Sequence, residues 1–167
     1  MQSLREEFLK MLSDYQGILH KVSLVYFSNA SDREDNFQEI VYQLWKSYPK
    51  IKNKDSIGSW IYSVSINTSI SRLKKEKHAG HSAGSPEVPD GSDIIDEIIK
   101  NESLRILLDA ISELDEISKS VMLLYLEEKS YDEIAIITGI SSSNVGVRIS
   151  RAKKILKENL NSKGYGK

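Results

Sequence analysis

Apolar residues along this chain recur every three or four positions, a spacing that predicts amphipathic helices. No segment shows the alternation of apolar and polar residues that a half-buried strand requires. We therefore predict helices on both sides of a central break. Before the break the recurring apolar residues are Leu4, Phe8, Met11, Tyr15, Ile18, Val22 and Val25, then Phe37, Ile40, Val41, Leu44 and Tyr48, then Ile57, Trp60, Ile61, Val64, Ile70 and Leu73. After it they are Ile94, Ile98, Leu104, Leu107, Ile111 and Leu114.

The break lies between His78 and Ser92, where three of the nine glycines and two of the three prolines are found. A run of this composition cannot bury enough apolar surface to offset the entropy of ordering it, so we interpret it as a linker. The predicted fold class is all-α, with two small helical domains joined by a flexible acidic linker. The predicted boundaries are a first domain over 1–78, a linker over 79–93, a second domain over 94–160 and a basic tail over 161–167.

Two Ser-x-x-Glu sequences, over 31–34 and 130–133, precede periodic apolar stretches. In this pattern the serine oxygen accepts a backbone N–H of the first turn while the glutamate reaches back toward the cap. We expect a helix to begin at each serine.

The net charge of −1 hides a strong segregation of charge along the chain. Residues 1–80 carry +3, residues 81–117 carry −8 and residues 118–167 carry +4. Surface charges interact over roughly 10 Å in physiological salt, so a polyanion meets local patches and not the average. The two ends are suited to nucleic acid, and the middle would repel it.

The segment from Ser130 to Leu160 has the pattern of a helix-turn-helix. A short helix fits Tyr131 to Thr138, with Ile134, Ala135 and Ile137 available to pack inward. Gly139 can adopt the left-handed conformation that ends a helix, and Ser141 can cap the next one.

Projecting the second helix at about 100° per residue separates an apolar stripe from a small, polar and basic face. The stripe consists of Val145, Ile149, Ala152 and Leu156. Phosphates need cations, base edges need short donors and acceptors, and a thymine methyl needs an apolar partner, so the opposite face suits a recognition helix in a major groove. The alternative is a solvated cationic helix face. The candidate DNA-binding residues are Ser143, Asn144, Val147, Arg148, Ser150, Arg151 and Lys154.

Gly146 fits neither interpretation of this helix, because a glycine inside a helix costs about 1 kcal/mol relative to alanine. Close approach of the backbone to DNA is one explanation, and simple tolerance is another.

A second basic cluster, over 72–77, closes a helix that we predict to begin near Ser56. A cationic loop over 48–55 precedes it, and Trp60 and Tyr62 follow among small polar residues. Basic grooves with aromatic stacking surfaces hold single-stranded DNA, although basic residues at a helix end also complement its dipole and such aromatics are more often core residues.

Several classes of site are excluded by composition. The absence of cysteine rules out disulfides and thiolate-bound zinc or iron–sulfur clusters, and His78 and His81 lack a third ligand nearby. We therefore expect no metal site and no cofactor. The chain has no long apolar run and begins with acidic residues where a secretory signal needs basic ones, so we expect a cytoplasmic protein without membrane insertion.

At this point the residues resemble a known family. The stretch 32–40, Leu44-Trp45, the stretch 59–62 and Asn67 resemble region 2 of the extracytoplasmic-function (ECF) group of bacterial RNA polymerase sigma factors. The segment from Leu114-Asp115 to Lys157 resembles region 4 of the same family. The family usually carries more arginine in its promoter-melting helix, where this chain has Ser63, Ser65, Thr68, Ser69 and Ser71.

The resemblance implies an alternative sigma factor, which is not an enzyme. It would bind core RNA polymerase and direct promoter-specific initiation by recognising the −35 element as duplex and the −10 element as melted DNA. The implied partners are the clamp coiled coil of the largest polymerase subunit, the flap region, promoter DNA and, as in many members of the family, an anti-sigma factor. Polymerase binding would fall to Asp32, Asp35, Gln38, Glu39 and Trp45, and binding of the melted strand to Lys52, Asn53, Lys54, Ser63, Asn67, Arg72 and Lys74.

Two other interpretations remain open from the residues. A stand-alone helix-turn-helix regulator with an N-terminal sensing or dimerisation domain would bind operator DNA without polymerase. An enzyme could use paired acids such as Asp32 and Asp35, but the sequence has no second acidic cluster, nucleophile motif or phosphate loop to support one.

Overall fold

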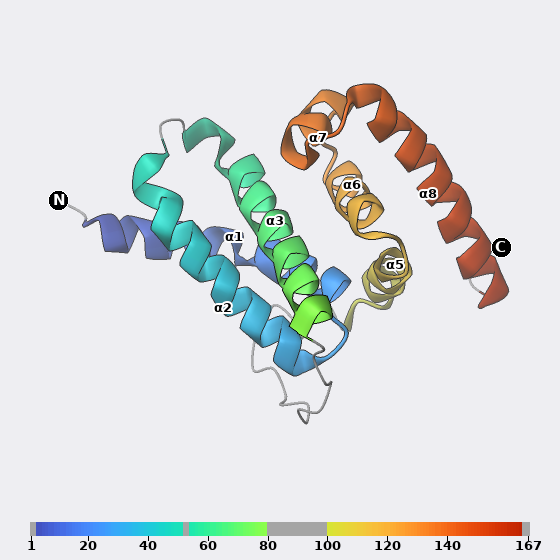
Figure 1. Ribbon diagram of the computed structural model, residues 1–167, viewed down its shortest axis with the longest axis horizontal. Helices are drawn as coiled ribbons and strands as arrows, with labels where there is room; N and C mark the ends of the chain where they lie inside the picture. Colours follow the sequence, from blue (N-terminus) through green and yellow to red (C-terminus); the bar gives the residue numbers. More distant parts are fainter. Residues whose placement is uncertain (1–2, 52–53, 80–99, 165–167) are drawn as a thin grey trace. The chain divides into compact units, whose positions relative to one another are not determined.

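The computed structural model describes residues 3–51, 54–79 and 100–164, and every regular element in these ranges is a helix (Figure 1). The chain divides into two compact units, residues 1–97 and 98–167. The predicted all-α fold is confirmed. Of the predicted linker over 79–93, only Ala79, the last residue of a helix, is described, and the rest lies outside the described residues together with Ile94 and Ile98.

The first unit is a bundle of three helices, α1 (Leu4–Tyr26), α2 (Ala30–Ser47) and α3 (Ile57–Ala79), each of which packs against the other two. Two short 3-10 turns, Tyr48–Lys50 and Lys54–Ser56, lie between α2 and α3. Tyr26, Phe27 and Ile66 are buried in this unit although the apolar pattern did not include them. The central cluster of the core consists of predicted apolar positions together with Leu19. Its buried members are Phe8, Met11, Leu19, Ile40, Leu44, Tyr48 and Ile61.

The start of α2 corrects one prediction. The cap is Asn29 and not Ser31, because Asn29 has the extended backbone of a cap residue and its Oδ1 accepts a hydrogen bond from the Asp32 N–H at 2.7 Å. Asparagine caps as well as serine does, and the Asn29 Nδ2 also donates to Asp32 Oδ2 at 2.8 Å. Arg33 Nη1 donates to the Ser28 carbonyl at 2.7 Å, which holds the turn before the helix. The helix therefore begins at Ala30.

A buried polar cluster joins the three helices of the first unit. Asn36 on α2 is fully buried, and its Nδ2 donates to Ser23 Oγ on α1 at 3.0 Å and to Ser69 Oγ on α3 at 2.9 Å. Ser69 Oγ in turn donates to the Ser65 carbonyl at 2.8 Å. Because buried polar groups are costly without partners, this cluster favours one register of the three helices over others. Two serines of α3, Ser65 and Ser69, thus lie in the core.

The second unit contains α5 (Glu102–Ser112), α6 (Glu116–Leu126), α7 (Tyr131–Thr138) and α8 (Ser142–Ser162). Each helix begins with a side-chain cap that accepts a hydrogen bond from a backbone N–H of the first turn; the caps are Asn101, Asp115, Ser130 and Ser141. Helices α6, α7 and α8 pack against one another around a buried apolar centre. Its most deeply buried large residues are Ile111, Val121, Leu124, Ile134, Val145 and Ile149.

We predict that Asn36→Ala lowers the free energy of unfolding of the first unit by about 2 kcal/mol, because it removes two hydrogen bonds and leaves Ser23 without this donor. Both tryptophans, Trp45 and Trp60, belong to this unit, so tryptophan fluorescence during urea unfolding follows it selectively. Asn67→Ala, the same change at an exposed position of α3, is the matched control and should alter stability by less than about 0.5 kcal/mol. Equal unfolding midpoints for the two variants would contradict the role of the cluster.

Candidate nucleic-acid interfaces

The turn between α7 and α8 has the geometry that the sequence predicts. The Ser130 Oγ accepts from the Glu133 N–H at 3.1 Å and donates to Glu133 Oε1 at 3.2 Å. Helix α7 ends at Gly139, whose φ of 80° lies in the left-handed region, and Ser141 Oγ accepts from the Asn144 N–H at 3.1 Å. A further bond, from Ser142 Oγ to Asp132 Oδ1 at 2.6 Å, joins the first turns of the two helices. The helix-turn-helix is therefore held at both ends of its turn.

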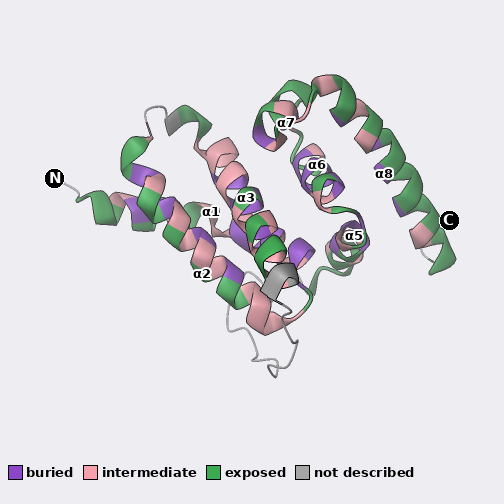
Figure 2. Cartoon of the chain, viewed as in Figure 1, coloured by how far each residue is buried: buried purple, intermediate pink, exposed green. Residues whose placement is uncertain are grey.

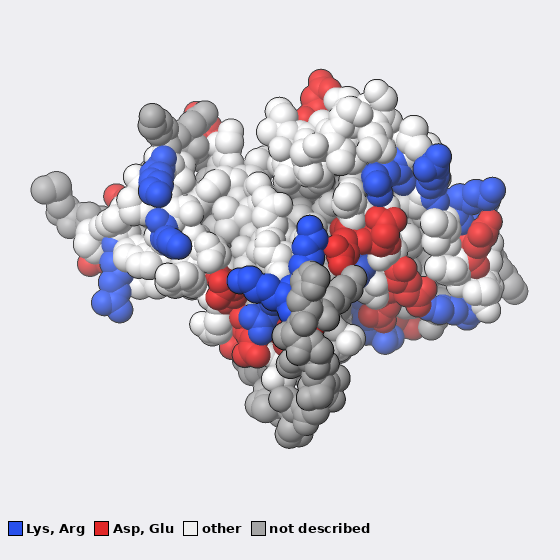
Figure 3. Space-filling model, in the orientation of Figure 1, with Lys and Arg blue, Asp and Glu red and all other residues white. Residues whose placement is uncertain are grey.

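Helix α8 has one buried stripe and one exposed face (Figure 2). All four residues predicted to face inward are buried, at 6% exposure or less. On the opposite side, the apolar Val147 is 44% exposed among small polar and basic side chains. The exposed members of the predicted DNA-binding set are Ser143, Asn144, Val147, Ser150, Arg151 and Lys154. The same arrangement leaves cations on the solvent side of α8 (Figure 3).

Gly146 lies under an aromatic ring. A Cβ at this position would come within 3.4 Å of Tyr131 Cε2, the nearest side-chain atom, on the first turn of α7. That distance is close to an ordinary van der Waals contact, so the packing tolerates a methyl group. The Tyr131 ring is thus a second reason for a small residue here, independent of DNA.

Arg148, the seventh member of the predicted set, is only 28% exposed. Its Nη1 donates to Asp115 Oδ1 and to Ser118 Oγ, both at 3.3 Å and both at the start of α6. Burial raises the pKa of Asp115, but hydrogen bonds from Ser118 and the charge of Arg148 outweigh it and hold that pKa below its ordinary value. Asp115 therefore stays ionised at neutral pH and pairs with Arg148.

Lys153 of α8 and Lys163, which follows the helix, are also bound within the second unit. Lys153 Nζ donates to Tyr125 Oη at 2.7 Å and lies 4.6 Å from the centroid of that ring, and the hydrogen bond raises the pKa of Lys153. Lys163 Nζ donates to Glu113 Oε1 at 2.7 Å. These contacts lie away from the exposed face of α8 and tie the helix to α6 and to the end of α5.

The candidate −10 residues lie on and before α3. Asn67 and Lys74 are exposed, Ser63 is half-buried, and Arg72 is 28% exposed with its Nη2 3.6 Å from Asp35 Oδ2 on α2. Lys52 and Asn53 lie outside the described residues, and Lys54 is described only as the first residue of its 3-10 turn. The aromatic residues of this helix belong mainly to the core, since Tyr62 is buried and Trp60 is half-buried against Tyr48.

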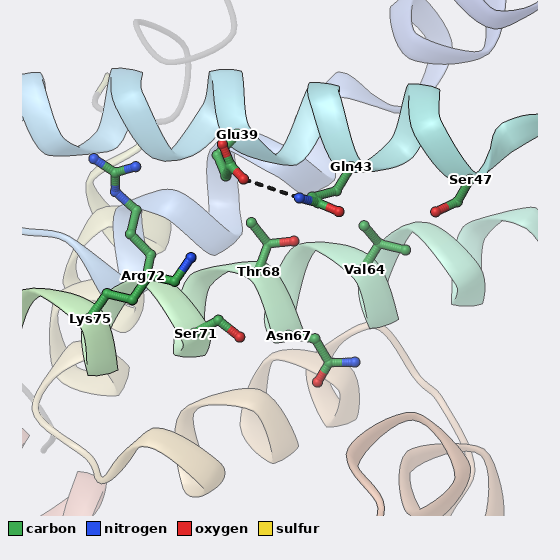
Figure 4. A pocket seen from close by; sticks show the side chains of 9 residues that line it. All are labelled: Glu39, Gln43, Ser47, Val64, Asn67, Thr68, Ser71, Arg72 and Lys75. Carbon is green, nitrogen blue, oxygen red and sulfur yellow. Dashed lines mark hydrogen bonds between the residues drawn. The ribbon is translucent and has the colours of Figure 1, made fainter.

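A polar groove of about 550 Å³ runs between α2 and α3 (Figure 4). One wall carries Glu39, whose Oε1 accepts from Gln43 Nε2 at 3.1 Å, and the other carries Arg72. Its full lining is Glu39, Gln43, Ser47, Val64, Asn67, Thr68, Ser71, Arg72 and Lys75. The groove brings Glu39 of the predicted polymerase-binding set beside Asn67 and Arg72 of the predicted −10 set.

The outer face of α2 carries the candidate polymerase-binding residues. Asp35 and Gln38 are exposed, Asp32 and Glu39 are half-buried, and Trp45 is 41% exposed with its ring edge-to-face on Phe8 at 5.0 Å.

Sequence reasoning missed one residue of this face. Tyr42 is 55% exposed on α2, and Lys46 Nζ lies 5.8 Å from its ring centroid. Tyr42 lies four residues after Gln38 and three before Trp45. Side chains at these spacings share a helix face, so this spacing could have identified Tyr42 from the sequence. Its apolar character concealed it in a search for core residues.

Among the described residues, no group of three or more potential ligands lies close enough to hold a metal ion. Within the same ranges, no helix combines the length and the apolar character needed to cross a bilayer.

Comparison with known families decides between the interpretations. Residues 11–79 match the family model for sigma-70 region 2, and residues 104–156 match the model for sigma-70 region 4. The chain is 26% identical over 161 residues to RNA polymerase sigma factor SigV of Bacillus subtilis, with 93% of this chain and 92% of SigV covered. It is 23% identical to the ECF sigma factor SigW of the same organism, with 93% and 90% covered. The chain belongs to the ECF sigma factors.

Solved structures agree on the fold of this sigma factor. The sigma factor RpoE from Bartonella quintana, solved in complex with the anti-sigma factor NepR, superposes with a TM-score of 0.69 at 20% identity and covers 93% of this chain and 97% of its own. CnrH, solved with the cytosolic domain of CnrY, gives a TM-score of 0.65 at 17% identity, with 93% and 88% covered. The matches to both family models and to the sigma factor relatives show that the protein functions as an alternative sigma factor in transcription initiation, and the stand-alone regulator is not favoured.

The two glycines of the helix-turn-helix should respond to alanine with opposite signs. Gly146→Ala should stabilise the second unit by up to about 1 kcal/mol, because the residue is helical and its Cβ has room beside Tyr131. Gly139→Ala should destabilise it by about 1 kcal/mol or more, because φ is +80° there. Hydrogen exchange of α7 and α8 amides in the full chain measures both. A loss of protection in Gly146→Ala would contradict the placement of this glycine.

Proposed function

We propose that this sigma factor binds core RNA polymerase through the outer face of α2, reads the −35 element as duplex with α8 and binds the melted −10 strand with α3 and the loop before it. The first predicted domain, over 1–78, serves polymerase and −10 binding, and the second predicted domain, over 94–160, serves −35 binding. The linker over 79–93 allows the two units to reach different elements of one promoter, and the tail over 161–167 adds positive charge.

The two-faced character of α8 carries the −35 assignment. Its exposed face runs from Ser143 to Lys154, a length of about 16 Å at 1.5 Å per residue, which fits along a major groove. Asn144 has an amide suited to base edges, Val147 an apolar surface suited to a thymine methyl, and Arg151 and Lys154 cations suited to phosphates or guanine. The start of the helix, which enters a groove first in this class of motif, is held by the Ser141 cap.

The −10 assignment rests on the exposed side of α3. Asn67 offers both donors and acceptors to unpaired bases, Lys74 offers charge to the backbone, and Ser63 and Arg72 lie along the same helix. Lys52, Asn53 and Lys54 belong to this proposal by the family resemblance.

The polymerase assignment rests on the chemistry of the outer face of α2. Carboxylates at Asp32, Asp35 and Glu39 would repel DNA and suit a basic protein surface such as the clamp coiled coil of the largest subunit. Tyr42 and Trp45 supply the exposed aromatic surface that anchors most protein interfaces. Gln38 completes the set, and the flap region is the proposed contact of the second unit.

An anti-sigma factor is a further proposed partner. The support is that the Bartonella quintana RpoE fold, which this chain shares, was solved with the anti-sigma factor NepR bound.

For −35 binding, we predict that Arg151→Ala, tested in the full chain assembled with core polymerase, weakens promoter binding. It should also lower the salt slope, which is the slope of log K against log salt concentration, by about 1 in magnitude. Val145→Ala should instead destabilise the second unit by on the order of 2 kcal/mol, because Val145 is fully buried. Lys10→Ala, which removes an equal charge paired with Asp14 on α1, is the control and should leave the slope unchanged. Equal losses of stability in the Arg151 and Val145 variants would overturn the assignment of the two faces.

For polymerase binding, the double variant Gln38→Ala/Glu39→Ala should lose about tenfold in affinity for core polymerase, or about 1.4 kcal/mol, while its unfolding midpoint stays near that of the parent chain. Retention of the purified chain on immobilised core polymerase measures the affinity. Lys10→Ala, an exposed change on α1, is the control. Undiminished retention of the double variant would rule out this face as the contact.

A further inference from the structure

Arg148 joins the middle of α8 to the first turn of α6. One atom, Nη1, donates to Asp115 Oδ1 and to Ser118 Oγ, both at 3.3 Å. The other candidate DNA-binding residues of α8 are exposed, whereas the Arg148 side chain is 28% exposed and its Nε is buried with no hydrogen-bond partner among the described residues. The guanidinium is therefore directed along the protein surface toward α6.

The acceptor of this arginine is itself rigidly held. Asp115 caps α6, with Oδ1 accepting from the Ser118 N–H at 2.9 Å and Oδ2 accepting from the Ser118 hydroxyl at 3.0 Å. The two hydrogen bonds from Ser118 thus orient both carboxylate oxygens independently of Arg148. Because this acceptor is fixed to the start of α6, a side chain that binds it is held at a set position relative to α6.

The place of Arg148 on α8 makes the contact sensitive to rotation of the helix. It lies three residues after the buried Val145 and directly before the buried Ile149, so it borders the inward stripe. A rotation of α8 by about 20° would move a side-chain tip by about 2 Å, because side chains extend the helix radius to about 5–6 Å. The apolar stripe alone tolerates small rotations, but two hydrogen bonds to fixed oxygens do not.

We infer that Arg148 is a positioning residue of the −35 reader and not one of its DNA contacts. Through Asp115 and Ser118 it sets the rotation of α8, so that Asn144, Val147 and Arg151 face the duplex. Its assignment to the DNA face followed from the helical projection, which places it on the flank but does not reveal the carboxylate on α6. The inference rests on the proposed role of α8 in −35 binding.

Electrostatics supports this role. If Arg148 bound a DNA phosphate instead, Asp115 would lose its cationic partner. Its negative charge would then be uncompensated beside a polyanion. Kept in its pair, Arg148 adds little net charge to the interface, and the phosphates are left to Arg151 and Lys154.

The test uses the full chain assembled with core polymerase and a promoter identified by transcription with that enzyme. Binding is measured over a series of KCl concentrations, for the promoter and for a derivative with a scrambled −35 element. The variants are Arg148→Ala, Asp115→Asn and the two combined. Asparagine retains the cap of α6 and removes the negative charge, so Asp115→Asn tests the pair without removing the cap.

The expected result is that each single variant loses about three- to tenfold in discrimination between the two promoters with an unchanged salt slope, and that the double variant is no worse than either. Arg148→Lys, which keeps the positive charge and a hydrogen-bond donor at this position, should retain part of the discrimination between the two promoters. A fall of about 1 in the salt slope for Arg148→Ala, with equal or tighter binding by Asp115→Asn, would overturn the inference, since Arg148 would then contact DNA.

Unchanged discrimination in folded Arg148→Ala and Asp115→Asn chains would also overturn it, because the contact would then serve stability alone. Circular dichroism at the assay temperature establishes that the variants are folded. Arg151→Ala, measured alongside, distinguishes a failure of the inference about Arg148 from a failure of the proposed DNA-binding role of α8. If Arg151→Ala changes neither affinity nor slope, the DNA-binding role of α8 itself fails, whatever Arg148 does.

Discussion

The packing of the apolar stripe of α8 against its own unit is the constraint on which the proposed −35 interface depends. Val145, Ile149, Ala152 and Leu156 are buried, and successive side chains on a helix are separated by about 100°. Burying one stripe therefore determines, to within small rotations, which side of the helix every other side chain occupies. The left-handed turn at Gly139 and the Ser141 cap decide where that helix begins, and hence which residues occupy its first two turns.

The first unit meets a different requirement, because α3 has to pack on two helices and also present a polar surface. Small residues make this possible. Ser65 and Ser69 are buried with Asn36, so α3 packs closely on its neighbours without a continuous apolar stripe. Asn67 is left exposed on the same helix. The serines of α3 therefore divide between core and surface, and charge on α3 is concentrated after residue 71.

Much of the second unit was predictable from sequence because its signals are local. The bounds of α7, the turn at Gly139, the cap at Ser141 and the buried stripe of α8 all follow from residues within a few positions of one another, and all are confirmed. The predicted cap of α2 was wrong for a local reason: Asn29 competes with Ser31, and two good cap residues in succession cannot be ranked by pattern alone. Contacts between helices were beyond the sequence. The Tyr131 ring over Gly146 and the Asp115 partner of Arg148, 33 positions earlier, appear only once the chain is folded.

We propose that the two helical units bind different forms of one promoter while polymerase holds them. Transcription from genomic fragments by the purified chain mixed with core polymerase tests it most directly. Initiation at a defined set of start sites that share −35 and −10 sequences, each requiring both the chain and the core enzyme, is the predicted result. Tight, specific binding of the chain alone to duplex DNA, with no specific initiation when core polymerase is added, would contradict it.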